Sequence, residues 1–426
     1  MHVLVLGSGG REHALAWAIA RSPLKPKVTT APGNAGTARL GGNIDLDLND
    51  FAGIGDFCKE EKIDLVVIGP EAPLVAGLAD PLRARGIPVF GPSGDAARLE
   101  GSKIFGKEFC RRHGIPTAAF KVFEKPDAAH SYIDRSRLET CVVKADGLAS
   151  GKGVLVCDDP IDAHASVDTC MLDRKFGDAG DRIIIEDRLE GFETTLMTLV
   201  AGSRYFKFPY SQDHKRAYDG DKGPNTGGMG VFAPTPKVTP ELDEQITREI
   251  VEPTIAAFAE DGIDYVGCLY FGIMVTEEGP YLLEFNCRFG DPEVQAVLPL
   301  VEGDFLAALV SCAHGELESG EVAASGKKAV AVILASKGYP EKYRKGVDVT
   351  ADIRALEKDD RLIVFHAGTR REGKKVLTSG GRVVAVTAVA DEFQECRRIA
   401  YDAIKARAME GLFYRTDIGH ELVAVG

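Results

Sequence analysis

Two features are missing from the sequence: a long apolar run and a regular pairing of cysteines. No apolar stretch approaches the ~18 residues of a membrane span, and the first residues, MHVLVLGSGG, lack the basic region and cleavage site of a secretory signal. The nine cysteines are scattered and form no Cys-x-x-Cys pair. A disulfide framework or a zinc site is therefore not expected, and the cysteines are predicted to be reduced core residues of a cytoplasmic protein.

Positive charge is also in short supply. The chain has 51 Lys and Arg against 64 Asp and Glu, which gives a formal net charge of −13. This balance argues against general affinity for nucleic acid or for an anionic membrane, so neither is expected as a partner. Any anionic ligand must be held by groups gathered locally. The 426 residues, 45% of them hydrophobic, are enough for roughly two to four domains.

Signatures of nucleophilic catalysis are absent as well. The sequence contains no Gly-x-Ser-x-Gly, no His-Glu-x-x-His and no kinase signature, and its histidines form no ligand-spaced pair. The absence of a nucleophile motif favours phosphoryl transfer, a reaction that an enzyme can catalyse by positioning its substrates and neutralising their charge.

The N-terminal part, residues 2–93, alternates between strands and helices. Strands are predicted at HVLVLG, KVTTAPG, IDLVVIGPE and IPVFGPS. Apolar strands separated by helices predict a parallel, doubly wound sheet with right-handed crossovers. In such sheets the loops after the strands face the ligand, and these loops are residues 7–12, 31–36 and 69–74.

The first of these loops, GSGGRE, leaves two interpretations open. A dinucleotide fingerprint is disfavoured because Glu12 replaces the third glycine and no acidic residue ends the strand KVTT. The loop either presents amides and a helix N-terminus to a phosphate or only makes a tight turn.

Further along the chain the pattern becomes mixed. Helices are predicted near 94–113, 240–261 and 294–313, with strands near 265–275 and 281–287.

Two polar stretches separate these elements. The first, residues 211–230, is long and rich in glycine near its end, and its apolar flanks favour a binding loop over a floppy connector. The second, residues 315–328, is small, polar and glycine-containing, which is typical of a linker. After it, AVAVILAS, LIVFHAG and GGRVVAVTAVA predict the strands of a smaller α/β domain.

The segment CVVKADGLASGKGVLV, residues 141–156, combines glycines with lysines. A Walker loop is disfavoured because Asp146 stands where its first glycine belongs and Gly153 replaces its Ser or Thr. A hairpin fits better, and its glycine-rich tip would bring amides and Lys152 onto phosphate oxygens as a movable lid. Lys144, in an apolar strand, would be costly to bury without an anionic partner. The alternative is an ordinary surface hairpin.

The segment RIIIEDRLEGFET, residues 182–194, is predicted to be a strand that ends at Glu186 and continues through Leu189 to a second acid, Glu193. Its edge amides and carbonyls suit adenine, and a carboxylate suits ribose hydroxyls. Many strands end in acids without any such role, and that alternative stays open.

The stretch EFNCRFGDPE, residues 284–293, has polar residues at alternate positions: Glu284, Asn286 and Arg288. In a strand these side chains share one face. Carboxylate and amide oxygens suit Mg²⁺ together with phosphates, and a guanidinium forks onto a carboxylate or phosphate. The alternative is an exposed Glu284–Arg288 ion pair without a ligand.

The order of these segments resembles the ATP-grasp superfamily, and most closely the glycinamide ribonucleotide synthetase family. The resemblance rests on strings that run in order between residues 7 and 419: NAGT, GPEAPL, LEGSK, KADGLASGKGV, FGDAG, SQDHKR, GPNTGGMG, EFNCRFGDPE, FHAGT, GGRV and RTDIG. Because they cover nearly the whole chain, they favour a stand-alone enzyme.

The resemblance implies an α/β and α+β multidomain fold with an N-terminal doubly wound parallel sheet, central ATP-grasp domains and a small C-terminal α/β domain. It divides the chain into an N-terminal ribose-phosphate domain at 1–101, an ATP-grasp large domain at 102–122 and 191–324, a lid at 123–190, and a C-terminal domain at 325–426.

The implied activity is an ATP-dependent ligation in de novo purine biosynthesis. Glycine would be joined to 5-phosphoribosylamine through a glycyl phosphate, giving glycinamide ribonucleotide, ADP and phosphate. ATP and Mg²⁺ (or Mn²⁺) are the implied cofactors, and the two other substrates are small molecules. A monomer is expected, because no exposed apolar helix or heptad is evident.

The resemblance also implies roles for individual residues. The nucleotide would be held by Lys103, Lys144, Gly147, Ser150, Gly151, Gly153, Glu186, Leu189 and Glu193. The metal would be held by Glu284 and Asn286, and catalysis would involve Lys152, Asp213 and Arg288. The substrates would be bound by Gly9, Gly10, Asn34, Gly36, Pro70, Glu71, Asp213, Lys215, Asn225 and Arg288.

Two residues depart from the family pattern. Phe192 stands where the family often has a second acid, and Phe271 is bulkier than the usual residue. A biotin-carboxylase-like ligase is the rival of the same class, and SQDHKR and GPNTGGMG argue against it. A nucleotide-sensing module without turnover would be expected to lack Glu284, Asn286 or a phosphate lysine, and all are present.

Overall fold

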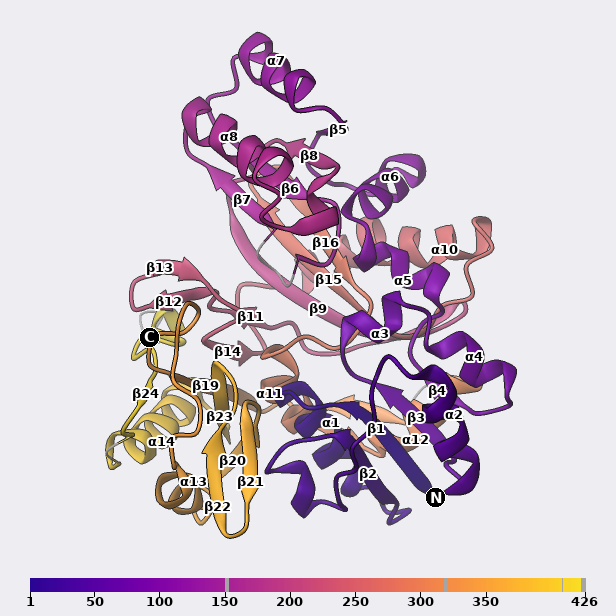
Figure 1. Ribbon diagram of the computed structural model, residues 1–426, viewed down its shortest axis with the longest axis vertical. Coiled ribbons are helices and arrows are strands. Elements are labelled where there is room, and N and C mark those ends of the chain that lie inside the picture. The colour runs from indigo at the N-terminus through magenta and orange to yellow at the C-terminus, as the bar shows by residue number, and fades with distance from the viewer. Residues whose placement is uncertain (150–152, 318–320, 408, 423–426) are drawn as a thin grey trace.

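The protein, a computed structural model that describes residues 1–149, 153–317, 321–407 and 409–422, is built around four larger sheets. In Figure 1 the N-terminal and C-terminal sheets lie at the bottom, and a small sheet with two helices, α7 (Pro126–Ser136) and α8 (Pro160–Val167), forms the top. The central sheet lies between them.

The N-terminal sheet is parallel, with strand order β2-β1-β3-β4. Its strands are β1 (His2–Gly7), β2 (Lys27–Pro32), β3 (Leu65–Ile68) and β4 (Val89–Phe90). Val3 and Val5 of β1 pack in one apolar cluster with α1 (Gly10–Ala20), whereas Leu4 and Leu6 pack in another with α2 (Phe51–Glu60). Because both faces are covered, the prediction of a doubly wound parallel sheet is confirmed.

The helix predicted near 94–113 is two helices, α5 (Gly94–Gly101) and α6 (Lys103–His113). Ser102 between them is extended, with φ −134° and ψ 113°, and its hydroxyl accepts a hydrogen bond from the amide of Phe105. Ser102 is thus the N-cap of a new helix. Its extended backbone breaks the chain into two helices although the pattern of apolar residues is continuous.

The central sheet is antiparallel, with order β10-β9-β15-β16. Its strands are β9 (Phe192–Ala201), β10 (Arg204–Lys207), β15 (Val266–Thr276) and β16 (Gly279–Asn286). The strands predicted near 265–275 and 281–287 are confirmed.

The small upper sheet is also antiparallel, with order β5-β8-β6-β7. It consists of β5 (Phe120–Phe123), β6 (Cys141–Ala145), β7 (Val154–Cys157) and β8 (Ile183–Glu186). Strands β6 and β7 pair directly, so the predicted hairpin is confirmed. Its tip at 150–152 lies outside the described residues.

The C-terminal sheet takes β11 from the polar stretch 211–230, and its next strand, β14, begins at the last residue of that stretch. The order is β11-β14-β19-β23-β20. The bounds are β11 (Gln212–Asp213), β14 (Gly230–Ala233), β19 (Lys328–Ser336), β20 (Leu362–His366), β23 (Arg382–Ala390) and β24 (Leu412–Phe413), which pairs with β19. Helices α13 (Thr350–Leu356) and α14 (Phe393–Lys405) belong to the same part of the chain. The stretch is therefore folded chain rather than an irregular loop.

The prediction of a single helix at 294–313 is wrong. The chain forms α11 (Glu293–Val297), a 3₁₀ turn over 298–300, β17 (Val301–Gly303) and α12 (Phe305–Ala313). Pro299 and Gly303, whose φ is +95°, interrupt a continuous helix. The predicted linker 315–328 contributes β18 (Val322–Ala324), which pairs with β17.

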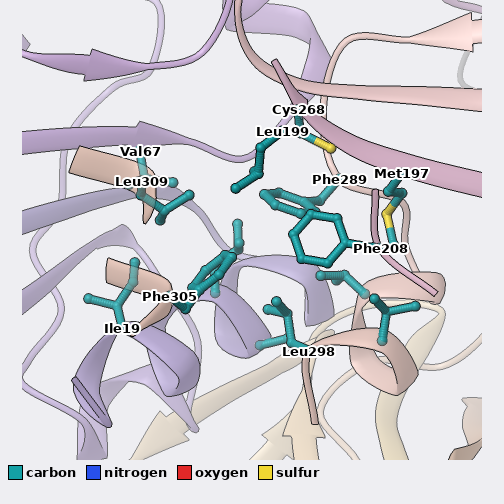
Figure 2. Close-up of a cluster of buried hydrophobic side chains, with 14 of the residues drawn as sticks. Ile19, Val67, Met197, Leu199, Phe208, Cys268, Phe289, Leu298, Phe305 and Leu309 are labelled. Carbon is teal, nitrogen blue, oxygen red and sulfur yellow. The ribbon is translucent and has the colours of Figure 1, made fainter. Parts of the chain in front are cut away.

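One hydrophobic cluster joins three of the sheets (Figure 2). Val67 comes from the N-terminal sheet, Leu199 from the central sheet and Ile333 from the C-terminal sheet. Phe208 and Phe305 fill the space between them. The relative placement of these sheets is thus fixed by close packing rather than by polar contacts alone.

All nine cysteines are free and buried, as the sequence predicts. Among the described helices, none combines the length and apolar character that a membrane crossing requires.

Replacing Phe208 with alanine is expected to lower the free energy of unfolding by about 3–5 kcal/mol, because the ring is fully enclosed and leaves a cavity. The ring is 2% exposed and lies 5.6 Å from Phe289, centroid to centroid. Urea denaturation followed by fluorescence of the single tryptophan, Trp17, measures this. Leu172→Ala is the control, since Leu172 is 59% exposed. Equal losses in the two variants would contradict the role given to the cluster.

Candidate active site

A cleft of about 620 Å³ is lined by residues of the central sheet and of the small upper sheet. The structure brings twelve of the sequence-predicted site residues to its walls: Glu71, Lys103, Lys144, Glu186, Leu189, Glu193, Asp213, Lys215, Asn225, Glu284, Asn286 and Arg288. They come from distant parts of the chain, and the fold therefore concentrates charge in one place.

One wall of the cleft holds a buried carboxylate between two ammonium groups. Glu186, the last residue of β8, forms ion pairs with Lys144 of β6 and Lys107 of α6, each with an N–O distance of 2.5 Å. Burial alone would raise the pKa of Glu186, but the attraction of Lys144 and Lys107 outweighs it, so this pKa lies below its usual range. Lys144 has the anionic partner that its burial requires.

The start of α6 is tied to the hairpin above it. Asp146 accepts hydrogen bonds from the Ser102 hydroxyl at 2.7 Å and from the Ile104 amide at 3.1 Å. Lys103 donates from Nζ to the carbonyl of Gly147 at 2.7 Å. Burial lowers the pKa of Lys103. Two phosphate-binding candidates, Lys103 and Lys144, thus lie at the base of the predicted lid.

The remaining predicted hairpin residues contribute differently. Gly153 closes the hairpin by accepting from the Ala145 amide at 2.9 Å. Gly147 packs so closely that a Cβ there would lie 2.6 Å from the Cβ of Ala179. Ser150, Gly151 and Lys152 lie outside the described residues.

Glu284 and Asn286 lie on β16, where they pair with Gly272 and Tyr270 of β15. Burial would raise the pKa of Glu284, but Lys215, Lys144 and Lys103 lower it further than burial raises it, so the group is ionised. Within the described residues this carboxylate has no ion pair. One ionised carboxylate and one amide oxygen fit Mg²⁺, which takes its other ligands from phosphates and water. No cluster of three His, Cys, Asp or Glu side chains that could bind a metal occurs among the described residues.

Arg288 pairs with carboxylates of the protein. Its NH2 lies 3.1 Å from Oε1 of Glu100, and its Nε lies 3.5 Å from Oε2 of Glu71. Burial would lower the pKa of Arg288, but Glu100 and Glu71 outweigh it and raise this pKa. The alternative of a Glu284–Arg288 ion pair is therefore wrong, because the guanidinium faces other acids. Arg288 NH2 also donates to Oδ1 of Asn286 at 3.2 Å, which orients the amide.

Asp213, on β11, lines the same cleft. Burial, followed by the negative charge of Glu293, raises the pKa of Asp213 well above its usual range. Its Oδ1 is buried without a hydrogen-bond partner in the described part of the chain. Lys215 nearby forms an ion pair with Glu193, and the attraction of Glu193 and Glu284 outweighs burial and raises the pKa of Lys215.

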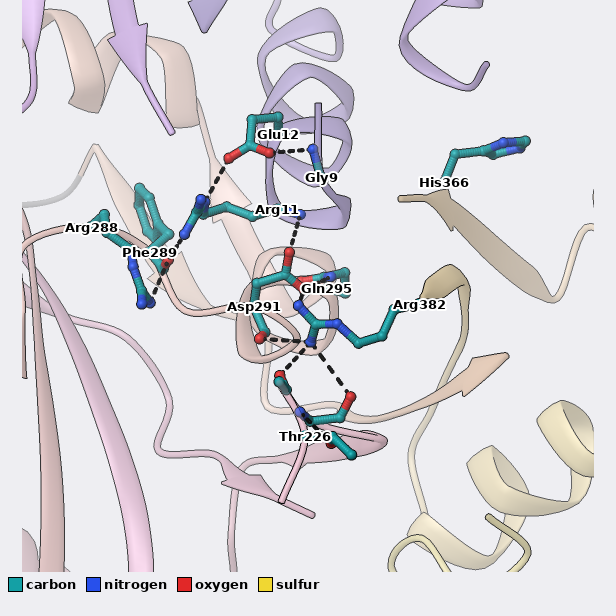
Figure 3. A network of polar contacts seen from close by, with 12 residues as sticks. Gly9, Arg11, Glu12, Thr226, Arg288, Phe289, Asp291, Gln295, His366 and Arg382 are labelled. Atoms are coloured by element: carbon teal, nitrogen blue, oxygen red, sulfur yellow. Dashed lines mark hydrogen bonds and ion pairs between the residues drawn. The ribbon is translucent and has the colours of Figure 1, made fainter. Parts of the chain in front are cut away.

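Two amides of the first N-terminal loop are already bonded to carboxylates (Figure 3). The amide of Gly9 donates to Glu12, and the amide of Arg11 donates to Oδ2 of Asp291 at 3.2 Å. Carboxylates thus already satisfy these two amides at the N-terminus of α1. Asp291 is in turn paired with Arg382, with an N–O distance of 3.1 Å.

The other predicted loop residues hydrogen-bond to backbone carbonyls or allow close packing of the chain. The Asn34 amide nitrogen donates to the carbonyls of Ser8 at 3.0 Å and His366 at 2.9 Å, which leaves this side chain committed. A Cβ at Gly36 would overlap the ring of His13 and one at Gly10 the amide of Gln295. Gly9, Gly10, Asn34, Gly36 and Pro70 do not line the cleft, whereas Glu71 does.

Sequence reasoning missed eight cleft residues with charged side chains: Glu100, Lys107, Asp187, Arg188, Arg216, Asp221, Asp291 and Glu293. Glu100 stands in LEGSK, and Asp291 and Glu293 stand in EFNCRFGDPE, so the motifs contained a signal for them. No motif of the sequence indicated Lys107, because it reaches the cleft only when the fold brings α6 against β8.

Three family models match the chain in order. They describe phosphoribosylglycinamide synthetase: its N domain matches residues 1–100, its ATP-grasp (A) domain residues 101–294, and its C domain residues 329–421.

Curated relatives match over nearly the whole chain. Phosphoribosylamine--glycine ligase of Rhizobium meliloti is 46% identical over 426 residues, which are 100% of this chain and 99% of that protein. The bifunctional purine biosynthetic protein ADE1 of Schizosaccharomyces pombe is 45% identical over 98% of this chain and 53% of its own length. The chain also spans only 42% of the trifunctional purine biosynthetic protein adenosine-3 of Gallus gallus.

Solved structures show the same fold. Phosphoribosylamine--glycine ligase from Thermotoga maritima superposes with a TM-score of 0.84 and 34% identity, covering 98% of this chain and 100% of that chain. The biotin carboxylase domain of a Hydrogenobacter thermophilus 2-oxoglutarate carboxylase has a TM-score of 0.73 at 15% identity, over 97% of this chain and 91% of that chain, a likeness of fold alone. The predicted fold class, with its ATP-grasp core, is confirmed.

Replacing Glu186 with glutamine is expected to lower the free energy of unfolding by about 3–5 kcal/mol at neutral pH, because two buried ammonium groups lose their counter-charge. A carboxyl with a lowered pKa stabilises the fold above its ordinary pKa of 4.5, and this contribution is lost as the pH falls further. The difference between wild type and variant should therefore shrink below that pH in urea titrations. Glu190→Gln, on the exposed connector, is the matched control. A pH-independent difference would contradict this assignment.

Proposed function

This chain belongs to the phosphoribosylglycinamide synthetase family, and we propose that it is an ATP-dependent ligase that joins glycine to 5-phosphoribosylamine. The observation that carries the proposal is the meeting of Lys103, Lys144 and Glu284 in one cleft, within the segment matched as an ATP-grasp domain. In such a cleft the two ammonium groups would neutralise phosphate charge, and the carboxylate would hold a metal ion.

The reaction needs activation because a glycine carboxylate does not react with an amine near neutral pH. A carboxylate oxygen attacks the γ-phosphorus of ATP, the bond to the β-phosphate oxygen breaks, and ADP leaves. The amine nitrogen of phosphoribosylamine then attacks the carbonyl carbon of the glycyl phosphate. The carbon–oxygen bond breaks, the nitrogen loses a proton, and phosphate and glycinamide ribonucleotide result.

We assign the nucleotide to the side of the cleft next to the upper sheet. Lys103 and Lys144, with the hairpin residues Gly147, Ser150, Gly151, Lys152 and Gly153, would hold the phosphates. Glu186, Leu189 and Glu193 would hold adenosine. Support comes from Glu186, whose lowered pKa makes it an ionised counter-charge 2.5 Å from Lys144.

The ATP-grasp fold generally uses a divalent metal, and Glu284 with Asn286 would hold one here. Mg²⁺ (or Mn²⁺) bound there would neutralise charge on the transferring phosphoryl group. Glu284 is kept ionised by Lys215, Lys144 and Lys103, and Asn286 Oδ1 is held by a hydrogen bond from Arg288 NH2 at 3.2 Å.

The substrates would occupy the opposite side. Arg288 and Asp213 would hold glycine, and Lys215 and Asn225 face the same space. The ribose phosphate would lie toward the N-terminal loops, with contacts from Gly9, Gly10, Asn34, Gly36, Pro70 and Glu71. Because Glu12 and Asp291 already satisfy two amides there, phosphate binding would require a shift of these carboxylates.

Three further assignments belong to the same proposal. The chain would divide into an N-terminal domain at 1–101, a large domain at 102–122 and 191–324, a lid at 123–190 and a C-terminal domain at 325–426. The protein would be a monomer. It would work in the cytoplasm, where its nine free, buried cysteines would stay reduced.

Phosphate release from ATP is expected to require glycine and phosphoribosylamine together, because the acyl phosphate needs the amine to turn over. A coupled phosphate assay in which each component is omitted in turn checks this. Equal turnover with bicarbonate, or with an unrelated acid and amine, would favour another ligase with the same nucleotide site.

Glu284→Ala is expected to lower turnover on the order of a hundredfold or more, since phosphoryl charge loses its metal. The variant should also bind Mn²⁺ more weakly in the presence of ATP, as measured by electron paramagnetic resonance. Glu277→Ala, an exposed acid beside the same strand, is the control. Wild-type Mn²⁺ affinity in the Glu284 variant would show that the metal lies elsewhere.

A further inference from the structure

A small hairpin at the edge of the cleft stands apart from the larger sheets. It consists of β12 (Arg216–Tyr218) and β13 (Lys222–Asn225), which pair only with each other among the described strands. Arg216, Asp221 and Asn225 line the cleft. Because an isolated two-stranded hairpin is marginally stable in water, its position must depend on outside contacts.

The main outside contact comes from the end of the described chain. The Arg415 side chain is fully buried and donates from NH1 to the carbonyl of Arg216 at 3.1 Å and to Oδ1 of Asp221 at 2.7 Å. Its Nε and NH2 donate to the two carboxylate oxygens of Asp417 at 2.7 and 2.8 Å. One guanidinium thus bridges the hairpin and the C-terminal segment in a fixed geometry.

The turn of the hairpin is held by the two residues that follow. Asp417 accepts from the amide of Gly220 at 2.7 Å, and Asp219 accepts from the amide of Thr416 at 2.7 Å and from its hydroxyl. Asp221 has φ of +52°, a conformation that side chains other than glycine seldom adopt. Its ion pair with Arg415 helps to hold that turn.

The C-terminal segment is itself anchored on α14. The Tyr401 hydroxyl donates to the carbonyl of Arg415 at 2.9 Å and accepts from the amide of Ile418 at 3.0 Å. A rigid helix therefore supports the segment that holds the hairpin.

The base of the hairpin is held from the same part of the protein. Arg382 of β23 donates to the carbonyl of Gly227, and Tyr339 accepts from the amide of Gly227 at 3.0 Å. Figure 3 shows Arg382 of the C-terminal sheet reaching the chain beside Thr226. Both ends of the segment 216–227 thus contact the C-terminal part.

We propose that Arg415, Thr416 and Asp417 are positioning residues that fix the hairpin 216–225 against the cleft for the two substrates other than ATP. The inference rests on the proposed function for the identity of those substrates. It gives the motif RTDIG a role in the enzyme. Residues 415–417 contact no reacting group, but they fix the position of the hairpin residues that would face the substrates.

Arg415→Ala and Thr416→Val test the proposal by hydrogen–deuterium exchange. Exchange in peptides covering 216–225 should rise roughly ten- to hundredfold in Arg415→Ala and less in Thr416→Val, while peptides covering β8 should stay unchanged. Thr416→Ser keeps the hydroxyl and should restore slow exchange. Arg398→Ala, at a 57% exposed arginine on α14, is the matched control.

Kinetics give the second readout. KM for glycine or for phosphoribosylamine should rise roughly tenfold while KM for ATP stays the same. Unchanged exchange at 216–225, or an equal rise in exchange at β8 and in KM for ATP, would overturn the proposal. If Arg415→Ala does not fold, Thr416→Val combined with Asp219→Asn carries the same test.

The exchange measurement needs no substrate. A wild-type protein without ligase activity would therefore defeat the proposed function and leave the exchange result standing, whereas normal activity with unchanged exchange would defeat only the positioning role.

Discussion

Charge compensation around Glu186 is the interaction on which the cleft depends. Two ammonium groups buried in protein would carry a desolvation cost far beyond ordinary stability, and one carboxylate with two oxygens offsets it for both. The same ion triad joins α6 to the upper sheet through Lys107, Lys144 and Glu186. Positive charge is thereby held at one wall of the cleft, where the proposed triphosphate would meet fixed groups rather than water.

The sequence is informative wherever one element carries its own signal. Strand alternation places Glu284 and Asn286 on one face of β16, and apolar strands between helices identify the parallel sheet. The hairpin around Lys144 follows from glycine and β-branched residues. In each case the deciding contacts lie within the element or between adjacent elements, so local patterns suffice.

What escaped prediction depends on partners distant in the chain. Asp291 caps the helix at Arg11 across 280 residues, and Glu100 accepts the amide of Cys287 across 187 residues. No local pattern indicates such a pairing. The broken helices at Ser102 and Pro299 show the other cause: a single cap or a single proline overrides a favourable helical pattern. Sequence motifs thus identified many of the charged residues of the site. Their hydrogen bonds and ion pairs with distant acids could be seen only in the folded structure.

The pairing of β14 with β19 has a consequence for synthesis of the chain. Strand β14 leaves the ribosome roughly a hundred residues before its partner, a delay of about 5–20 seconds at ordinary elongation rates. The Arg415 segment emerges later still. A nascent chain therefore completes the central and upper sheets while β14 still lacks β19, so an interrupted translation product would expose the unpaired edge of β14.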